Sequence, residues 1–292
     1  MKKSSLKLVA LISIFVMLLG ASFYSVEHGT FNNSRYARSL SIDFSYLEDY
    51  FQQEPEELLA PKAPSGTMIK VPIFIYHSVR PYVSGESVMQ DRFDVTPELF
   101  EQQLVYLQSH GYTTISPDML AIDIEMGTTT PVAKPVMLTF DDGWENQYKY
   151  AFPLLKKYHM IATFYVYTKP IDNAKSIYLS WDQLREMQEA GMTIGSHTMT
   201  HPLFKKISLI NIQKEIFESK KDIEQHLHKT VLHFASPFGY SDAAIENLVK
   251  SAGYTTARGT HRGVYHSSAD KYNLQGYFVS DSINEFAYIL NR

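Results

Sequence analysis

The chain has 292 residues, of which 45% are hydrophobic and 13% aromatic, enough for one large domain or two small ones. A formal net charge of −4 offers no basic surface of the kind that binds nucleic acid, so we expect no nucleic-acid partner. The chain has no cysteine, which excludes disulfides, thiolate metal sites and a cysteine nucleophile.

The N-terminus has the pattern of an export signal. Lysines at positions 2, 3 and 7 precede an almost unbroken apolar stretch over residues 8–24. This stretch is at the lower limit for crossing a bilayer, about 17 residues, and no clear small-residue cleavage site follows it. We expect residues 1–27 to act as a membrane anchor or a cleaved signal, so that the rest of the chain is exported across the cytoplasmic membrane.

Residues 28–67 are predicted to form a juxtamembrane segment and linker. Their aromatic and acidic residues show no clear period, and the segment contains "PKAPSG", with two prolines and a glycine. We predict a single domain over residues 68–292.

Within this domain, strand-like apolar runs alternate with amphipathic helical runs. We predict strands over 71–76, 113–116, 134–140, 161–167, 192–196, 231–236 and 255–259. We predict helices over 97–111, 117–127, 146–159, 180–191, 208–227 and 241–253, the third of them interrupted early by Pro153. The charged run 218–229 is typical of a solvated helix face. The alternation predicts a parallel sheet or an α/β barrel, with functional residues at the C-terminal ends of the strands.

The first predicted strand, "VPIFIY", is followed directly by His77. Its neighbours leave two interpretations open. His77 is either a core histidine bonded to a backbone carbonyl, or an imidazole that the strand carries into a site.

A pair of acidic residues follows the strand 134–140. The motif "TFDDGW" contains Asp141, Asp142 and Trp144. Adjacent carboxylates repel each other, and burying either one is costly unless a positive group lies nearby. The alternative is an Asp-Gly turn with both carboxylates solvated.

Two histidines follow the strand 192–196, in "SHTMTHP". His197 and His201 are four residues apart, so in a helical turn they would share a face and could ligate one ion; the alternative is two unrelated surface histidines. Two histidines and a carboxylate describe a hydrolytic zinc site or a non-haem iron site. The second aspartate favours hydrolysis, because a metal lowers the pKa of water and a nearby carboxylate can then take the proton.

"TFDDGW", "SHTMTHP" and "SPFG", in this order, resemble the polysaccharide deacetylases of the NodB-homology class, carbohydrate esterase family 4. The resemblance covers residue 68 to the C-terminus and implies an α/β fold, an irregular (β/α) barrel. It implies that Asp141 is the general base and that Asp142, His197 and His201 hold one divalent metal ion. Zn²⁺ is the first expectation, and Co²⁺, Ni²⁺ or Fe²⁺ would also fit.

The third motif departs from the family. Pro237, Phe238 and Gly239 match, and the family role of the Phe238 N–H is to stabilise the oxyanion. Ala235 stands where much of the family has an arginine that orients the base, which leaves the orientation of Asp141 without an assigned partner. Trp144 is a candidate for stacking on a sugar.

The family's general acid, a histidine late in the chain, has no clear match. His261 and His266 lie in polar, turn-like stretches. Circularly permuted, biofilm-type relatives place the acid-bearing strand first, and the strand that ends at His77 resembles it. The resemblance therefore implies that His77 is the general acid.

These features predict an exported, metal-dependent N-deacetylase of an N-acetylglucosamine-containing polysaccharide. The permuted histidine and the missing arginine favour poly-β-1,6-N-acetylglucosamine as the polymer. The alternatives are the same chemistry on peptidoglycan or chitin oligomers, or a catalytically inactive glycan-binding protein.

Overall fold

The computed structural model describes residues 67–82, 93–127, 132–279 and 282–292. The predicted anchor and residues 28–66 of the predicted juxtamembrane segment lie outside them. In the part of the chain that is described, no helix is both long and apolar enough to cross a membrane.

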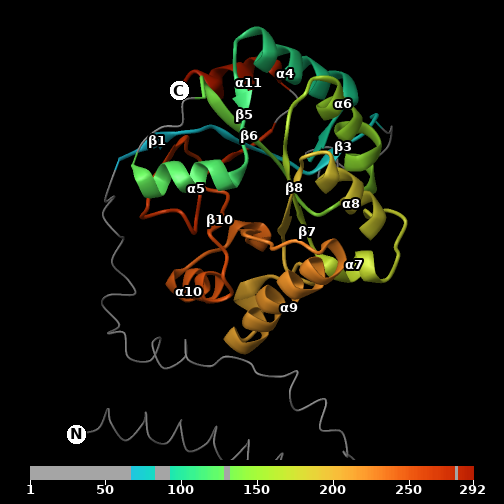
Figure 1. Ribbon diagram of the computed structural model, residues 1–292, viewed down its shortest axis with the longest axis vertical. Coiled ribbons are helices and arrows are strands. Elements are labelled where there is room, and N and C mark those ends of the chain that lie inside the picture. The colour runs from blue at the N-terminus through green and yellow to red at the C-terminus, as the bar shows by residue number, and fades with distance from the viewer. Residues whose placement is uncertain (1–66, 83–92, 128–131, 280–281) are drawn as a thin grey trace, which may run out of the picture. The chain divides into compact units, whose positions relative to one another are not determined.

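A parallel sheet forms the centre of the domain (Figure 1). Its strands run in the order β10-β9-β8-β7-β6-β2-β12, and β5 pairs with β6. The strands are β2 (Ile73–Tyr76), β5 (Thr113–Thr114), β6 (Pro135–Phe140), β7 (Thr163–Val166), β8 (Thr193–Ser196), β9 (His233–Ala235), β10 (Thr256–Arg258) and β12 (Tyr277–Phe278). All their pairings are parallel, as the strand–helix alternation predicts.

The sheet curls until its two edge strands are linked. Before β12, Leu274 donates its N–H to the carbonyl of Ala257 on β10 (2.8 Å) and accepts from the N–H of Gly259 (3.0 Å). β12 itself pairs with β2 at the other edge. The result is the irregular (β/α) barrel that the resemblance implied, and that prediction is confirmed.

Helices surround the strands (Figure 1). They are α4 (Pro97–Ser109), α5 (Pro117–Met126), α6 (Phe152–Lys157), α7 (Thr168–Asp172), α8 (Trp181–Glu189), α9 (Leu209–Leu227), α10 (Ala243–Ser251) and α11 (Ile283–Leu290). A π-helical segment over 147–151 precedes α6, in the stretch where a helix interrupted by Pro153 was predicted. Pro153 has no N–H for the regular ladder, which accounts for the irregular turn.

Stacked rings show which way the central strands face. Tyr76, Phe140 and Phe164 share one register position on β2, β6 and β7, and their rings stack at 5.0 and 4.7 Å. The Tyr76 hydroxyl donates to a glutamine on α4, so these rings face the helices. Side chains alternate along a strand, so the next residues, His77 and Asp141, face the barrel interior.

Short elements that the sequence analysis did not identify complete the domain. β1 (Ile69–Lys70) pairs with β11 (Tyr265–His266) in an antiparallel ribbon, and β3 (Ser78–Val79) pairs with β4 (Asp94–Val95) in parallel. Each strand has two residues, which is too short to show a hydrophobic period. The β3–β4 pair lies immediately after His77 and so helps to form one side of the site.

Candidate active site

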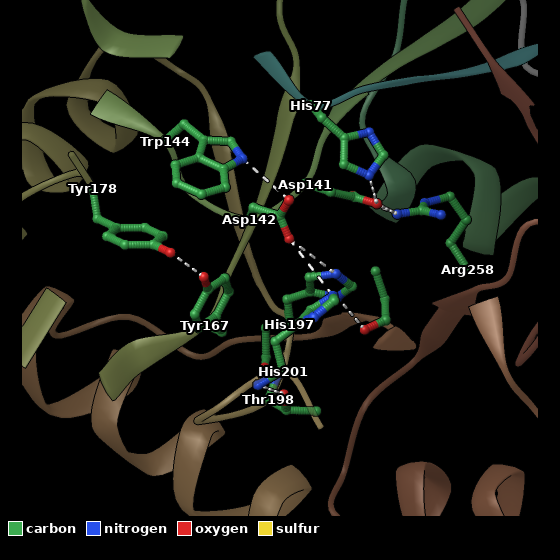
Figure 2. Close-up of polar contacts among 12 residues, drawn as sticks. His77, Asp141, Asp142, Trp144, Tyr167, Tyr178, His197, Thr198, His201 and Arg258 are labelled. Carbon is green, nitrogen blue, oxygen red and sulfur yellow. Dashed lines mark hydrogen bonds and ion pairs between the residues drawn. The ribbon is translucent and has the colours of Figure 1, made fainter. Parts of the chain in front are cut away.

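The predicted site residues meet at the carboxyl ends of the strands (Figure 2). His77 follows β2, Asp141 and Asp142 follow β6, and His197 follows β8. His201 joins them from the loop after β8. This is the edge of a parallel barrel at which functional residues are expected.

Asp142, His197 and His201 each offer one ligand atom, and these atoms lie within 4.8 Å of one another. Oδ1 of Asp142 is 3.8 Å from Nε2 of His197 and 3.6 Å from Nε2 of His201. Nδ1 of His197 donates to the carbonyl oxygen of Ala235 (2.6 Å), which leaves its Nε2 lone pair facing Asp142. One carboxylate and two imidazole nitrogens fit a divalent transition metal such as zinc.

The loop over 197–201 is not the helical turn considered from the four-residue spacing. Thr198 and His201 have left-handed backbone angles, with φ of 73° and 55°. Asp142 and Phe238 are also left-handed, at 73° and 57°. Non-glycine residues avoid this region, so backbone strain is concentrated around the three candidate ligands.

Burial controls the charge state of these side chains. It lowers the pKa of His197 to about 3 and also lowers the pKa of His201, so both imidazoles are neutral and free to act as donors. Burial raises the pKa of Asp142. A cation held by Asp142 would offset this penalty, because it favours the ionised carboxylate.

Trp144 contacts the candidate ligand aspartate. Its indole N–H donates to Oδ2 of Asp142 (3.1 Å), while Oδ1 faces the two histidines. The Trp144 ring stacks on Tyr178 at 4.6 Å, and the Tyr178 and Tyr167 hydroxyls are 2.5 Å apart. One face of the indole is therefore covered by protein, and the N–H orients the Asp142 carboxylate.

The positive group that a buried aspartate pair requires is Arg258, at the end of β10. Its Nη2 donates to both oxygens of Asp141, and both residues are nearly inaccessible, at 1% and 3% exposed. Burial by itself would raise the pKa of Asp141, but its polar neighbours, with the charge and hydrogen bonds of Arg258 first among them, together outweigh this effect and keep the pKa below its ordinary value.

Arg258 is the partner of Asp141 that the sequence analysis left unassigned. In the register of β9 and β10, Arg258 lies directly opposite Ala235, the position at which the motif lacks its arginine. The guanidinium therefore comes from the neighbouring strand. The predicted strand 255–259 carries an arginine at its C-terminal end, and that was the available signal.

His77 lies beside Asp141, with Nε2 4.0 Å from Oδ2 (Figure 2). Its ring contacts Phe93 (4.8 Å between centroids) and Phe278 (5.6 Å). Nε2 of Gln147 donates to the backbone carbonyls of both His77 and Asp141, at 2.6 and 2.5 Å, and so ties the two strand ends together. Of the two interpretations of His77, the geometry favours the one in which a strand carries it into a site.

The two other candidate acids lie elsewhere. His266 is fully buried on β11, with Nε2 2.9 Å from the carbonyl oxygen of Val71. His261 is exposed, and its carbonyl accepts from the N–H of Gly276 (2.8 Å). Neither has a contact that would bring it to Asp141.

The third motif forms a short turn over Pro237–Gly239 beside the candidate ligands. The Phe238 side chain is 63% exposed, and its ring lies 4.7 Å from that of His201. Gly239 has a φ of +68°, and a Cβ there would lie 2.0 Å from Oγ1 of Thr260. Only glycine fits this position, which fixes the turn that presents Phe238.

The mouth of the curled parallel barrel holds a carboxylate, two histidines and a buried aspartate–arginine pair. This arrangement fits a hydrolase site of the NodB type. The profile of the family described as "Polysaccharide deacetylase" matches residues 128–257. Residues 128–257 therefore form a polysaccharide deacetylase domain. The matched stretch includes Asp141, Asp142, His197 and His201 but not His77.

Individual proteins are similar over most of the chain. A putative polysaccharide deacetylase, YxkH of Bacillus subtilis (strain 168), is 29% identical over 219 residues, which is 75% of each protein. The poly-beta-1,6-N-acetyl-D-glucosamine N-deacetylase of Staphylococcus aureus (strain N315) is 24% identical over 74% of this chain and 80% of its own length. The solved structure of the Streptococcus pyogenes deacetylase PplD in complex with acetate has a TM-score of 0.70 and 27% identity, covering 76% of this chain and 95% of that one.

Proposed function

We propose that this polysaccharide deacetylase is a metal-dependent N-deacetylase of N-acetylglucosamine residues in an extracellular polymer, poly-β-1,6-N-acetylglucosamine. The observation that carries the proposal is the convergence of Asp142, His197 and His201 on one point beside Asp141 and His77. A base, an acid and a metal site are the groups that metal-assisted amide hydrolysis uses.

In this proposal Asp142, His197 and His201 hold one divalent ion, Zn²⁺ first. When bound there, such an ion would supply Lewis acidity toward the acetyl carbonyl and the attacking water. Asp141 takes the proton from the attacking water, and Arg258 keeps that carboxylate ionised and aimed. The Phe238 N–H donates to the oxyanion that develops on the acetyl group.

His77 completes the reaction by donating a proton to the departing amine nitrogen as the carbon–nitrogen bond breaks. The products are acetate and a free amine, which is cationic at neutral pH. The reaction therefore gives the polymer positive charge.

Two observations support poly-β-1,6-N-acetylglucosamine as the polymer. The S. aureus relative is named as a deacetylase of that polymer, and the site residues follow the permuted order of the biofilm-type relatives. His77, the proposed acid, precedes the other site residues by more than sixty positions. The export signal in residues 1–27 supports a location on the outer face of the cytoplasmic membrane, where such a polymer is accessible.

Acetate release tests the proposal directly. Purified protein would be incubated with poly-β-1,6-N-acetylglucosamine, chitin oligomers and peptidoglycan, each with and without a chelator and with Zn²⁺ restored. We expect chelator-sensitive release, fastest from the first polymer. Faster release from either of the others would reassign the substrate, and none from any polymer with any divalent ion would favour the glycan-binding alternative.

A further inference from the structure

The loop that carries the two candidate histidine ligands is held by one buried carboxylate. Glu215 lies on α9 and is only 9% exposed. Its Oε2 accepts the N–H groups of Met199 (2.8 Å) and Thr200 (2.9 Å), and its Oε1 accepts the Thr200 hydroxyl (2.7 Å). Three hydrogen bonds therefore fix the middle of the loop between His197 and His201.

The loop conformation is suited to an anion. Two successive N–H groups converge on one oxygen after a residue with left-handed angles, Thr198, and such concave backbone arrangements bind negative groups. The Thr198 side chain also accepts the N–H of His201 (3.0 Å). The hydrogen bonds to Glu215 therefore hold the backbone immediately before the second ligand.

The opposite side of the loop is held by α7. The N–H groups of Thr168 and Lys169 donate to the carbonyls of Thr198 (3.2 Å) and Met199 (2.9 Å). The loop is thus fixed through its carbonyls by α7 and through its N–H groups by Glu215.

Further polar residues extend this contact along one face of α9. Ser219, one turn after Glu215, is 2.7 Å from the Ser196 hydroxyl at the end of β8. Asp222, at the next position on that face, accepts from the Thr168 hydroxyl (3.0 Å). Spacings of four and three residues place these three side chains in one row on α9. Through this row α9 contacts the loop itself, the end of β8 that precedes the loop, and α7.

We propose that Glu215 is a positioning residue that sets the conformation of the 197–201 loop, and with it the affinity and geometry of the metal centre. The inference rests on the proposed function, because it takes Asp142, His197 and His201 as metal ligands. Supporting groups behind metal ligands typically change metal affinity about 10- to 100-fold when removed.

The test measures metal binding by the full chain. Metal-free wild type, Glu215→Ala, Glu215→Gln and Thr200→Val would be titrated with Zn²⁺ against a chromophoric chelator. Glu218→Ala is the matched control, since Glu218 lies on the same helix with its side chain 39% exposed. Circular dichroism and thermal unfolding of the metal-free proteins report whether each variant is folded.

Glu215→Ala should weaken Zn²⁺ binding at least about 10-fold and change the visible absorption of the Co²⁺-loaded protein. Glu215→Gln should recover most of the affinity, because its amide oxygen can accept both N–H groups and its NH₂ can donate to the Thr200 hydroxyl. Thr200→Val, which removes one bond of three, should cause a smaller loss. Glu218→Ala should bind as the wild type does.

Three results would overturn the inference and leave the metal centre itself in place. Wild-type affinity in folded Glu215→Ala would show that the loop needs no such support. Equal losses in the Ala and Gln variants would assign the effect to the charge of Glu215 rather than to its hydrogen bonds. If Glu215→Ala does not fold, unchanged affinity in both Glu215→Gln and Thr200→Val would overturn it. A wild-type chain that binds no divalent ion would refute the metal centre itself, and the inference with it, a result distinct from the other three.

Discussion

Asp141 and Asp142 are adjacent in the chain but have different surroundings. Asp141 is bonded to Arg258, and Asp142 faces two neutral histidines and accepts from Trp144. Their pKa shifts are opposite, lowered for Asp141 and raised for Asp142. The environment therefore distinguishes the proposed base from the proposed ligand, although the residue type is the same.

Substitution of each aspartate should separate these roles. Asp142→Ala should lose bound metal and acetate release together. Asp141→Asn should keep one metal per chain but lose at least about 100-fold in turnover, because the base is removed. Metal content and acetate release provide the measurements, and turnover retained in Asp141→Asn would refute the base assignment.

The pairing of Arg258 with Asp141 is a second contact between single residues that substitution can test. Arg258→Met would leave the Asp141 carboxylate buried and unpaired, so unfolding free energy should fall by about 3–5 kcal/mol. Turnover should fall at least about 10-fold even where the protein remains folded, since the base is no longer held. Arg258→Lys should recover part of both losses. The exposed Arg262 provides the control, Arg262→Gln, and wild-type turnover in Arg258→Met would exclude a positioning role.

At the scale of elements, parallel neighbours bring the site together. β2 and β6 are paired over four residues, so the residues that follow them, His77 and Asp141, emerge side by side. Phe93, just before β4, and Phe278 on β12 lie around the His77 ring. A change in strand register by one residue would turn these side chains to the other face.

His77→Gln tests the acid role of the β2 strand end. We expect turnover on an N-acetylated polymer to fall at least about 100-fold with metal content unchanged. A phenolic acetate ester has a leaving group that needs no proton, so its hydrolysis should be affected much less. The exposed His261 is the control, as His261→Gln. Equal losses on amide and ester would contradict the assignment of His77 as acid to the leaving amine.

At the scale of the whole domain, His266 joins the β1–β11 ribbon to the chain leading into β2. Burial lowers its pKa, so the unfolded chain binds a proton that the folded chain does not. The free energy of unfolding should therefore fall as pH drops below the ordinary histidine value of about 6.5.

Urea unfolding of metal-free wild type and His266→Gln at pH 7.5 and 5.5 would measure this effect. The variant should lose less stability between the two pH values than the wild type does. His197 and His201 titrate in both proteins, so their contribution cancels in the comparison. Equal losses would show that His266 does not contribute to the pH dependence.

Much of the fold and of the candidate site could be predicted because the signals are local. Each predicted strand and helix from residue 68 onward corresponds to an element of the structure, but α7, β12 and α11 were not predicted. Asp141, Asp142 and His197 lie directly after strands, His201 lies in the loop after β8, and parallel strands end at one edge. Ligand types and strand ends can both be recognised in a linear sequence.

The partners of these residues depended on tertiary structure. Arg258 is 117 positions from Asp141 and meets it only because the sheet curls and β10 pairs in register with β9. Glu215 belongs to a helix whose charged run, 218–229, is typical of a solvated face, yet Ser219 and Asp222 within that run bond to β8 and α7. Sequence alone determined the fold class and the groups available for chemistry. Register and packing decided which charges are buried together, because contacts between distant residues have no periodic signal in the chain.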